Sequence, residues 1–290
     1  MKKRIIKPEP KGWQKIQQAW QKMTSPSRPS LGDMKIYNDF MAAVLNKCAH
    51  GRVLILGATP ELRNLVMKRA LSRRIDLYLL DLNQDMIRAM DQFIEIKNVV
   101  QKKIIGGWLS MPFKNEYFDV VLGDEVLINV DQEDREKLLL EISRVLKKRG
   151  AFITRASHVN PQARTFTVRK SFDKYTNLYL QNKLTFNQVL NYLFEEMFEL
   201  SYFKNKKKFL LIKTLLPECL KEARSSKPLK KFIINSFIRE YKALFNQCWS
   251  WELKSAQIKR FKKYFLIKKI KSANDYWYAH ILPIYLLIKN

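Results

Sequence analysis

The feature that most constrains the fold is an alternation of short apolar runs with amphipathic helical patterns over residues 52–154. Such alternation is typical of βαβ units, which build a parallel sheet. The first unit is the most sharply marked. An apolar run, Arg52–Gly57, ends in a turn, and the turn leads into a helix that Thr59 can cap and Pro60 can begin.

Four further strands are expected, at 75–80, 99–105, 118–122 and 151–154. Asn83 can cap the helix of the second unit. Arg73 and Arg74 are expected in the last turn of the first helix, where cations favour the helix dipole. Lys147–Arg149 and Gly150 are expected to end the helix before the fifth strand.

Beyond residue 160 the spacing becomes helical, and the sequence returns to strands near its end, at Tyr264–Ile267 and Pro283–Ile288, which would pair antiparallel. We therefore predict an α/β fold: a doubly wound, mostly parallel sheet of about seven strands with a helical insertion. The expected parts are a mobile basic tail (1–12), an N-terminal helical cap (13–49), a cofactor-binding core (50–160), the insertion or lid (161–262) and the C-terminal strand pair (263–290).

The chain is strongly basic, with 54 Lys and Arg against 27 Asp and Glu, a net charge of +27. Residues 161–290 carry +17 of that charge. Such a field attracts nucleic acid, an anionic membrane surface or an acidic substrate. Lys outnumbers Arg by 37 to 17, however, which is equally consistent with a solvated surface that has no specific partner.

The cysteines Cys48, Cys219 and Cys248 are widely spaced and odd in number, which argues against a disulfide framework and against a zinc site. We expect a reducing, cytoplasmic location and no metal. No apolar run approaches the length of a membrane span, about 18 residues, so no transmembrane segment is predicted. The oligomeric state is left open.

Candidate ligand-binding residues fall at the carboxyl ends of strands, where open α/β sheets bind their ligands. Gly57 ends the first strand, and Asp81, at the end of the second, is suitably placed to accept hydrogen bonds from ribose hydroxyls. A dinucleotide's pyrophosphate needs three glycines, but Thr59 and Glu61 occupy the other two positions. A ligand with a nucleoside and no phosphate fits better, and S-adenosylmethionine is such a ligand.

Five segments, in order, resemble the class I S-adenosylmethionine-dependent methyltransferases. They are Val53–Leu62 for motif I, Leu80–Met86 for the second motif, Gly106–Phe113 and Phe118–Val121 for the third and fourth, and Arg144–Gly150 before the fifth strand. The resemblance implies a Rossmann-like core. The Gly-Ala-Thr-Pro-Glu-Leu turn is similar to that of a poorly characterised bacterial subgroup.

The resemblance also implies residue roles. The cofactor contacts it implies are Gly57, Ala58 and Thr59 for the methionyl part, Asp81 for the ribose, Leu82 and Met86 beside it, Gly107 and Trp108 for the adenine, and Asp124 for the ammonium. Arg155, Arg28 and Tyr37 are candidates for acceptor binding, and His158 and Asp124 for catalysis. Each could instead be structural: Trp108 as core, Asp124 as the start of a loop, Arg28 as a surface ion pair, and His158 as an incidental loop histidine.

We predict a methyltransferase that acts by in-line displacement, which needs alignment of donor and acceptor and no protein nucleophile. A small-molecule acceptor is favoured over nucleic acid. The alternatives are an RNA-binding protein or RNA methyltransferase that uses the basic second half, and a non-catalytic scaffold with a degenerate cofactor site.

Overall fold

A computed structural model describes residues 20–21, 23–205, 211–246 and 249–290. The predicted tail over 1–12 lies outside these residues. The chain divides into two compact units, each assembled from separate stretches. The helical unit comprises Met1–Arg28 and Val159–Trp251, and the sheet unit comprises Pro29–His158 and Glu252–Asn290.

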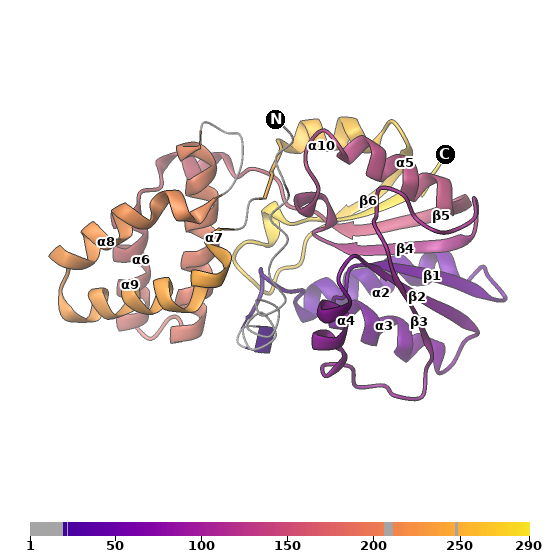
Figure 1. The fold of residues 1–290 in the computed structure, drawn as a ribbon, viewed down its shortest axis with the longest axis horizontal. Helices are drawn as coiled ribbons and strands as arrows, with labels where there is room; N and C mark the ends of the chain where they lie inside the picture. The colour runs from indigo at the N-terminus through magenta and orange to yellow at the C-terminus, as the bar shows by residue number, and fades with distance from the viewer. Residues whose placement is uncertain (1–19, 22, 206–210, 247–248) are drawn as a thin grey trace. The chain divides into compact units, whose positions relative to one another are not determined.

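Within the described residues, the sheet unit contains a seven-stranded sheet with the order β3-β2-β1-β4-β5-β7-β6 (Figure 1). The neighbouring strands among the first five are parallel, and β7 pairs antiparallel with both β5 and β6. This confirms the predicted fold class. The strands are β1 (Gly51–Leu56), β2 (Ile75–Asp81), β3 (Gln101–Ile105), β4 (Phe118–Asp124), β5 (Leu146–Arg155), β6 (Phe265–Lys271) and β7 (Ile284–Lys289).

Helices cover both faces of this sheet, which explains why its central strands are apolar almost throughout. α5 and α10 lie on one face, and α2 and α3 lie on the other (Figure 1). In β1, Val53–Leu56 is completely buried. The helices of the unit are α2 (Leu31–Leu45), α3 (Pro60–Ala70), α4 (Gln84–Asp91), α5 (Arg135–Val145) and α10 (Lys254–Phe261).

The first two helices of the core begin where the sequence predicts. Pro60 is the first residue of α3, and the Asn83 side chain caps α4 by accepting from the backbone N–H groups of Asp85 and Met86. The predicted end of α3 is wrong, because the helix stops at Ala70. Arg73 lies beyond it and donates instead to backbone carbonyls that follow α2.

The predicted end of α5 is also wrong. The helix stops at Val145, and the residues expected in its last turn begin β5, where Leu146 pairs with Phe118 of β4. Both side chains are fully buried, so strand pairing outweighs the helix-end preference of the lysines. Arg149 adopts a left-handed φ of 62°, and the β4–β5 register shifts nearby.

β6 is one of the two edge strands of the sheet and carries exposed lysines. Its register against β7 shifts between Ile267 and Lys269. Charged side chains and an irregular register both prevent an edge strand from pairing with another chain. Part of the basic charge of the second half therefore has a structural explanation.

The helical unit contains α6 (Val168–Leu180), α7 (Phe186–Lys204), α8 (Leu216–Ser225) and α9 (Pro228–Tyr241). Its core is rich in aromatic side chains, with Phe172 packed edge-on against Phe237. The buried Glu196 carboxylate accepts hydrogen bonds from Ser171 and Tyr175. No helix in the described part of the chain is long and apolar enough to cross a membrane.

Glu199 of α7 is the least satisfied acid of the helical unit. Its side chain is buried, one oxygen accepts from Asn160 at 3.3 Å, and Oε1 has no hydrogen-bond partner among the described residues. Burial raises the pKa of Glu199 well above its ordinary value, and the charges of Glu195 and Glu196 add to this effect. Folding therefore favours the protonated carboxyl.

We expect Glu199→Gln to remove a pH dependence of stability. Because Glu199 binds its proton more tightly in the folded state, it contributes fully to stability below about pH 4.5. This contribution to the free energy of unfolding is lost as pH rises through the pKa of the folded state. At about pH 8 the free energy of unfolding of the variant should exceed that of the wild type by at least about 1 kcal/mol. Urea unfolding at several pH values measures this. Glu218→Gln, which breaks an exposed pair with Lys204, is the matched control and should change little.

A second prediction concerns Gly150, which lies where two backbones approach closely. A Cβ there would meet the carbonyl oxygen of Lys147 at 2.9 Å and that of Asp119 at 3.1 Å. Gly150→Ala should therefore destabilise the protein by about 1–3 kcal/mol in chemical unfolding. Gly107→Ala, whose new Cβ would meet only the Leu82 side chain at 3.7 Å, should change stability by less than about 1 kcal/mol. Equal losses for the two variants would contradict the close-packing argument.

Candidate active site

The turn after β1 brings a positive-φ glycine to the carboxyl edge of the sheet. Gly57 has a φ of 90°, which residues with a Cβ rarely adopt, and its N–H donates to the carbonyl of Leu80 in β2. Ala58 is buried, and Thr59 is the N-cap residue of α3. The Thr59 side chain makes no capping hydrogen bond, so the expected cap contact is not formed.

Asp81 ends β2 beside this turn. One carboxylate oxygen accepts from the backbone N–H of Asn83 at 2.8 Å, and Asp81 has no ion pair in the described part of the chain. Burial raises the pKa of Asp81, which the N–H groups of Asn83 and Leu82 partly offset. The second oxygen can therefore accept hydrogen bonds from a ligand. Leu82 is exposed, and Met86 is half-buried in the first turn of α4.

Trp108 lies across the same edge. Its Nε1 donates to the Leu80 carbonyl at 3.0 Å, and its ring comes within 3.6 Å of where a Cβ on Gly57 would be. Gly107, the preceding residue, faces Leu82. The structure thus brings together predicted residues from three loops, namely Gly57, Asp81, Leu82, Gly107 and Trp108.

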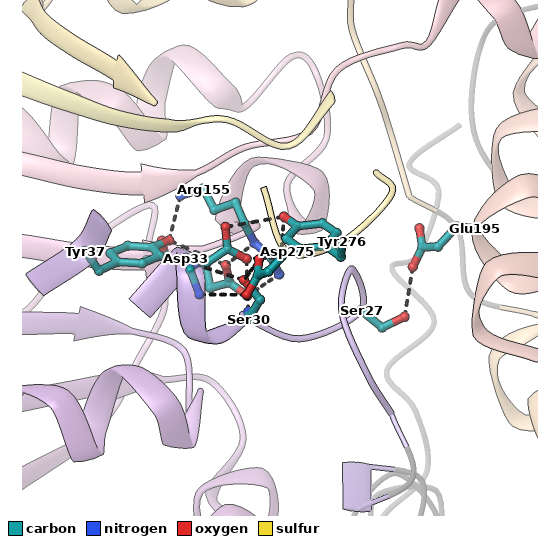
Figure 2. A network of polar contacts seen from close by, with 11 residues as sticks. Ser27, Ser30, Asp33, Tyr37, Arg155, Glu195, Asp275 and Tyr276 are labelled. Carbon is teal, nitrogen blue, oxygen red and sulfur yellow. Dashed lines mark hydrogen bonds and ion pairs between the residues drawn. The ribbon is translucent and has the colours of Figure 1, made fainter. Parts of the chain in front are cut away.

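A buried ion cluster occupies the ends of the next two strands (Figure 2). Arg155 of β5 binds Asp124 of β4 through two hydrogen bonds, Nε to Oδ1 at 2.8 Å and Nη2 to Oδ2 at 3.0 Å. Its Nη1 donates to Asp33 Oδ2, from α2, at 3.2 Å. Arg155 and Asp33 are completely buried, and the Asp124 side chain is 6% exposed. We name this group the Asp33–Arg155–Asp124 cluster.

Two tyrosines complete the surroundings of the cluster. The buried Tyr37 hydroxyl donates to the Gly123 carbonyl at 2.8 Å and accepts from the backbone N–H of Arg155 at 2.6 Å. The Tyr276 hydroxyl lies 3.4 Å from both Asp33 and Arg155. Tyr37 and Arg155, both proposed from sequence as acceptor contacts, thus have structural partners, and their roles toward an acceptor stay predictions.

The start of α2 explains how Asp33 is held in the cluster. Ser30 and Asp33 form a capping box, in which the Ser30 side chain accepts from Asp33 N–H and Asp33 accepts from Ser30 N–H. Asp275 then accepts from the Ser30 hydroxyl at 2.7 Å and from Gly32 N–H at 2.8 Å. The sequence shows the capping box, but nothing in it indicates that Asp33 meets Arg155, and the site role of Tyr276 was not predicted.

His158 lies just beyond β5, and its backbone N–H donates to the Ile281 carbonyl. Its side chain is buried, and Nδ1 has no hydrogen-bond partner among the described residues. Burial, followed by the charges of Lys254 and His280, lowers the pKa of His158 to about 4. The imidazole is therefore neutral at neutral pH.

Arg28 belongs to the helical unit, where it donates to the Trp20 carbonyl at 3.2 Å. Its predicted contact with an acceptor stays a prediction. No group of three or more metal-binding side chains occurs within the described ranges.

The comparisons with known proteins agree with this architecture. Residues 61–154 match a family model described as a methyltransferase domain, and no curated protein matches the chain. A structure described as a putative Zn-dependent alcohol dehydrogenase from Rhodobacter sphaeroides is similar, with 15% identity and a TM-score of 0.58 over 99% of this chain and 100% of that one. A protein from Pyrococcus horikoshii OT3 has 13% identity and a TM-score of 0.52 over 89% of this chain and 92% of that one. A SAM-dependent methyltransferase from Methanosarcina mazei has 13% identity and a TM-score of 0.50 over 83% of this chain and 93% of that one. At these identities the likeness shows a shared fold.

The match to a methyltransferase domain covers residues 61–154, which lie within the sheet unit. The matched domain supports the prediction of an enzyme, and the predicted cofactor is S-adenosylmethionine. The match begins at Glu61, so it does not include the Gly57 turn. The geometry fits such a cofactor independently, because two glycines, an acidic acceptor and an indole face one edge.

The ion cluster generates a stability prediction. Arg155→Met leaves two buried carboxylates without their cation, and we expect a loss of about 3–5 kcal/mol in the free energy of unfolding. Arg88→Met is the matched control, because its partner Asp85 is 3.7 Å away and both side chains are more than half exposed. It should change stability by less than about 0.5 kcal/mol. A similar small loss for both variants in urea unfolding would show that the cluster does not stabilise the fold.

Proposed function

We propose that this protein transfers a methyl group from S-adenosylmethionine to a small-molecule acceptor by in-line displacement. The observation that carries the proposal is Asp81, a half-buried carboxylate without an ion pair in the described residues, beside the positive-φ turn at Gly57. A carboxylate in that position is suited to two ribose hydroxyls. The turn at Gly57–Leu62 is then a variant of the motif I of the bacterial subgroup.

In this proposal the cofactor contacts follow the strand ends. Asp81 accepts from the ribose, with Leu82 and Met86 beside it, and residues Gly57–Thr59 face the methionyl part. Trp108 offers its indole to the adenine, next to Gly107. When it is bound in this way, S-adenosylmethionine supplies a methyl group that is activated by its own positively charged sulfur.

The remaining roles concern the acceptor. No covalent intermediate is needed, so the protein contributes alignment and exclusion of water. Burial lowers the pKa of His158 to about 4, which makes it a weak base, so its role as the catalytic base stays a prediction. In this proposal Asp124, whose two carboxylate oxygens accept from Arg155, lies beside the methionyl part. Arg155 acts through Asp124, as a positioning residue, since its side chain is buried.

Two observations favour other functions. The Trp108 ring fills the space above Gly57, which is what a scaffold that has lost its cofactor would show. The exposed lysines of β6 would favour RNA, although edge protection accounts for them equally well. Binding of RNA through such lysines would fall steeply with salt.

Calorimetric titration with S-adenosylhomocysteine tests the proposal. Asp81→Ala should weaken binding by about tenfold or more, the usual value of a hydrogen bond to a charged group. Trp108→Ala should also weaken it by about tenfold, because a stacked base gains about 1–3 kcal/mol from an aromatic ring. Trp277→Ala, at an exposed tryptophan of the same unit, is the control.

Each other outcome has a definite meaning. A wild-type protein that binds neither S-adenosylmethionine nor its product would establish the scaffold. Unchanged binding by Asp81→Ala would remove the ribose role. Tighter binding by Trp108→Ala would show that the indole blocks the site and does not stack on the adenine.

A further inference from the structure

The Asp33–Arg155–Asp124 cluster contains one cation and two carboxylates. Arg155 is always protonated in proteins, so the cluster carries one net negative charge when both carboxylates are ionised. Buried charge is costly unless it is compensated, and when Asp33 is ionised the compensation is incomplete by one unit. The cluster therefore favours a further positive charge nearby.

The register of the sheet places this charge beside the proposed cofactor site. Leu56 of β1 pairs with Leu80 of β2 on one side and with Gly123 of β4 on the other. The next residues along these strands are Gly57, Asp81 and Asp124, on neighbouring strands about 4.8 Å apart. Asp124 also pairs with Arg155 of β5. The ribose acceptor and the cluster thus flank Gly57 on opposite sides.

The chemistry of transfer changes the charge at this position. When a lone pair of the acceptor takes the methyl carbon, the carbon–sulfur bond breaks and its electron pair stays on sulfur. The sulfur becomes neutral, and the positive charge passes to the acceptor, which sheds it by releasing a proton where it has one. S-adenosylmethionine therefore carries one more positive charge than S-adenosylhomocysteine.

We propose that the net negative charge of the Asp33–Arg155–Asp124 cluster makes the site bind the sulfonium cofactor in preference to the thioether product. The inference rests on the proposed function and assigns to Asp33, which contacts neither ligand, a positioning role through charge. Preference for the charged form also favours release of the product after transfer. At an effective dielectric constant of about 20, one charge at about 10 Å changes affinity by about tenfold.

Calorimetry with both ligands tests the inference. Wild-type protein should bind S-adenosylmethionine about tenfold more tightly than S-adenosylhomocysteine. Asp33→Asn keeps the shape of the side chain and removes its charge. It should abolish this preference, because it should weaken the binding of S-adenosylmethionine and leave the binding of S-adenosylhomocysteine unchanged. Asp275→Asn is the matched control, since Asp275 binds the same helix start but is exposed and outside the buried cluster. Its preference should match that of the wild type.

A second measurement needs only wild-type protein, in case Asp33→Asn does not fold. The groups that face Asp33 are Arg155, Asp124, Tyr276 and Tyr37, together with the N–H of Ser30. Burial raises the pKa of Asp33, and Arg155 partly offsets this. A cation nearby favours the ionised carboxylate, so at mildly acidic pH S-adenosylmethionine should release more protons on binding than S-adenosylhomocysteine. Titration in buffers of different ionisation enthalpy measures this difference.

The outcomes separate the two proposals. If wild-type protein binds neither ligand, the proposed function fails. If it binds both with equal affinity and equal proton release, or if folded Asp33→Asn keeps the wild-type preference, the charge inference alone is overturned.

Discussion

The bonds that Arg155 makes to Asp124 and Asp33 hold together elements that lie far apart in the sequence. They join β4, β5 and α2, and Tyr276 brings the loop before β7 to the same point. A completely buried guanidinium is tolerated only with such partners. The start of α2 and the carboxyl ends of two central strands are thus fixed by one side chain, and the geometry of the edge beside Gly57 depends on it.

Much of the fold could be predicted because its determinants are local. Strands covered on both faces are apolar almost throughout, and turns and caps such as Gly57 and Asn83 have their own residue preferences. The predicted ends of α3 and α5 were wrong because contacts with distant parts of the chain decide where these helices stop. Leu146 leaves the helix pattern because its partner is Phe118, and α3 ends before Arg73 because that side chain binds the end of α2.

The candidate site divides in the same way. Gly57, Asp81 and Gly107 could be placed from sequence, since strand ends of a parallel sheet meet at one edge. The ion cluster could not, because Asp33 lies about a hundred residues from both of its partners in the chain. The sequence marks Trp108 as a possible adenine contact, but its bond to Leu80 and its position over Gly57 depend on contacts between segments that are distant in the chain.

The position of β7 between β5 and β6 affects how the protein folds. Ala151 pairs with Ile288, so the intervening chain, which includes most of the helical unit, forms a long loop that this part of the sheet closes. Contacts of such long range slow folding, because the entropy of loop closure is lost before the strands gain their hydrogen bonds. Until β7 arrives, β5 exposes one edge, and an exposed strand edge can pair with another molecule.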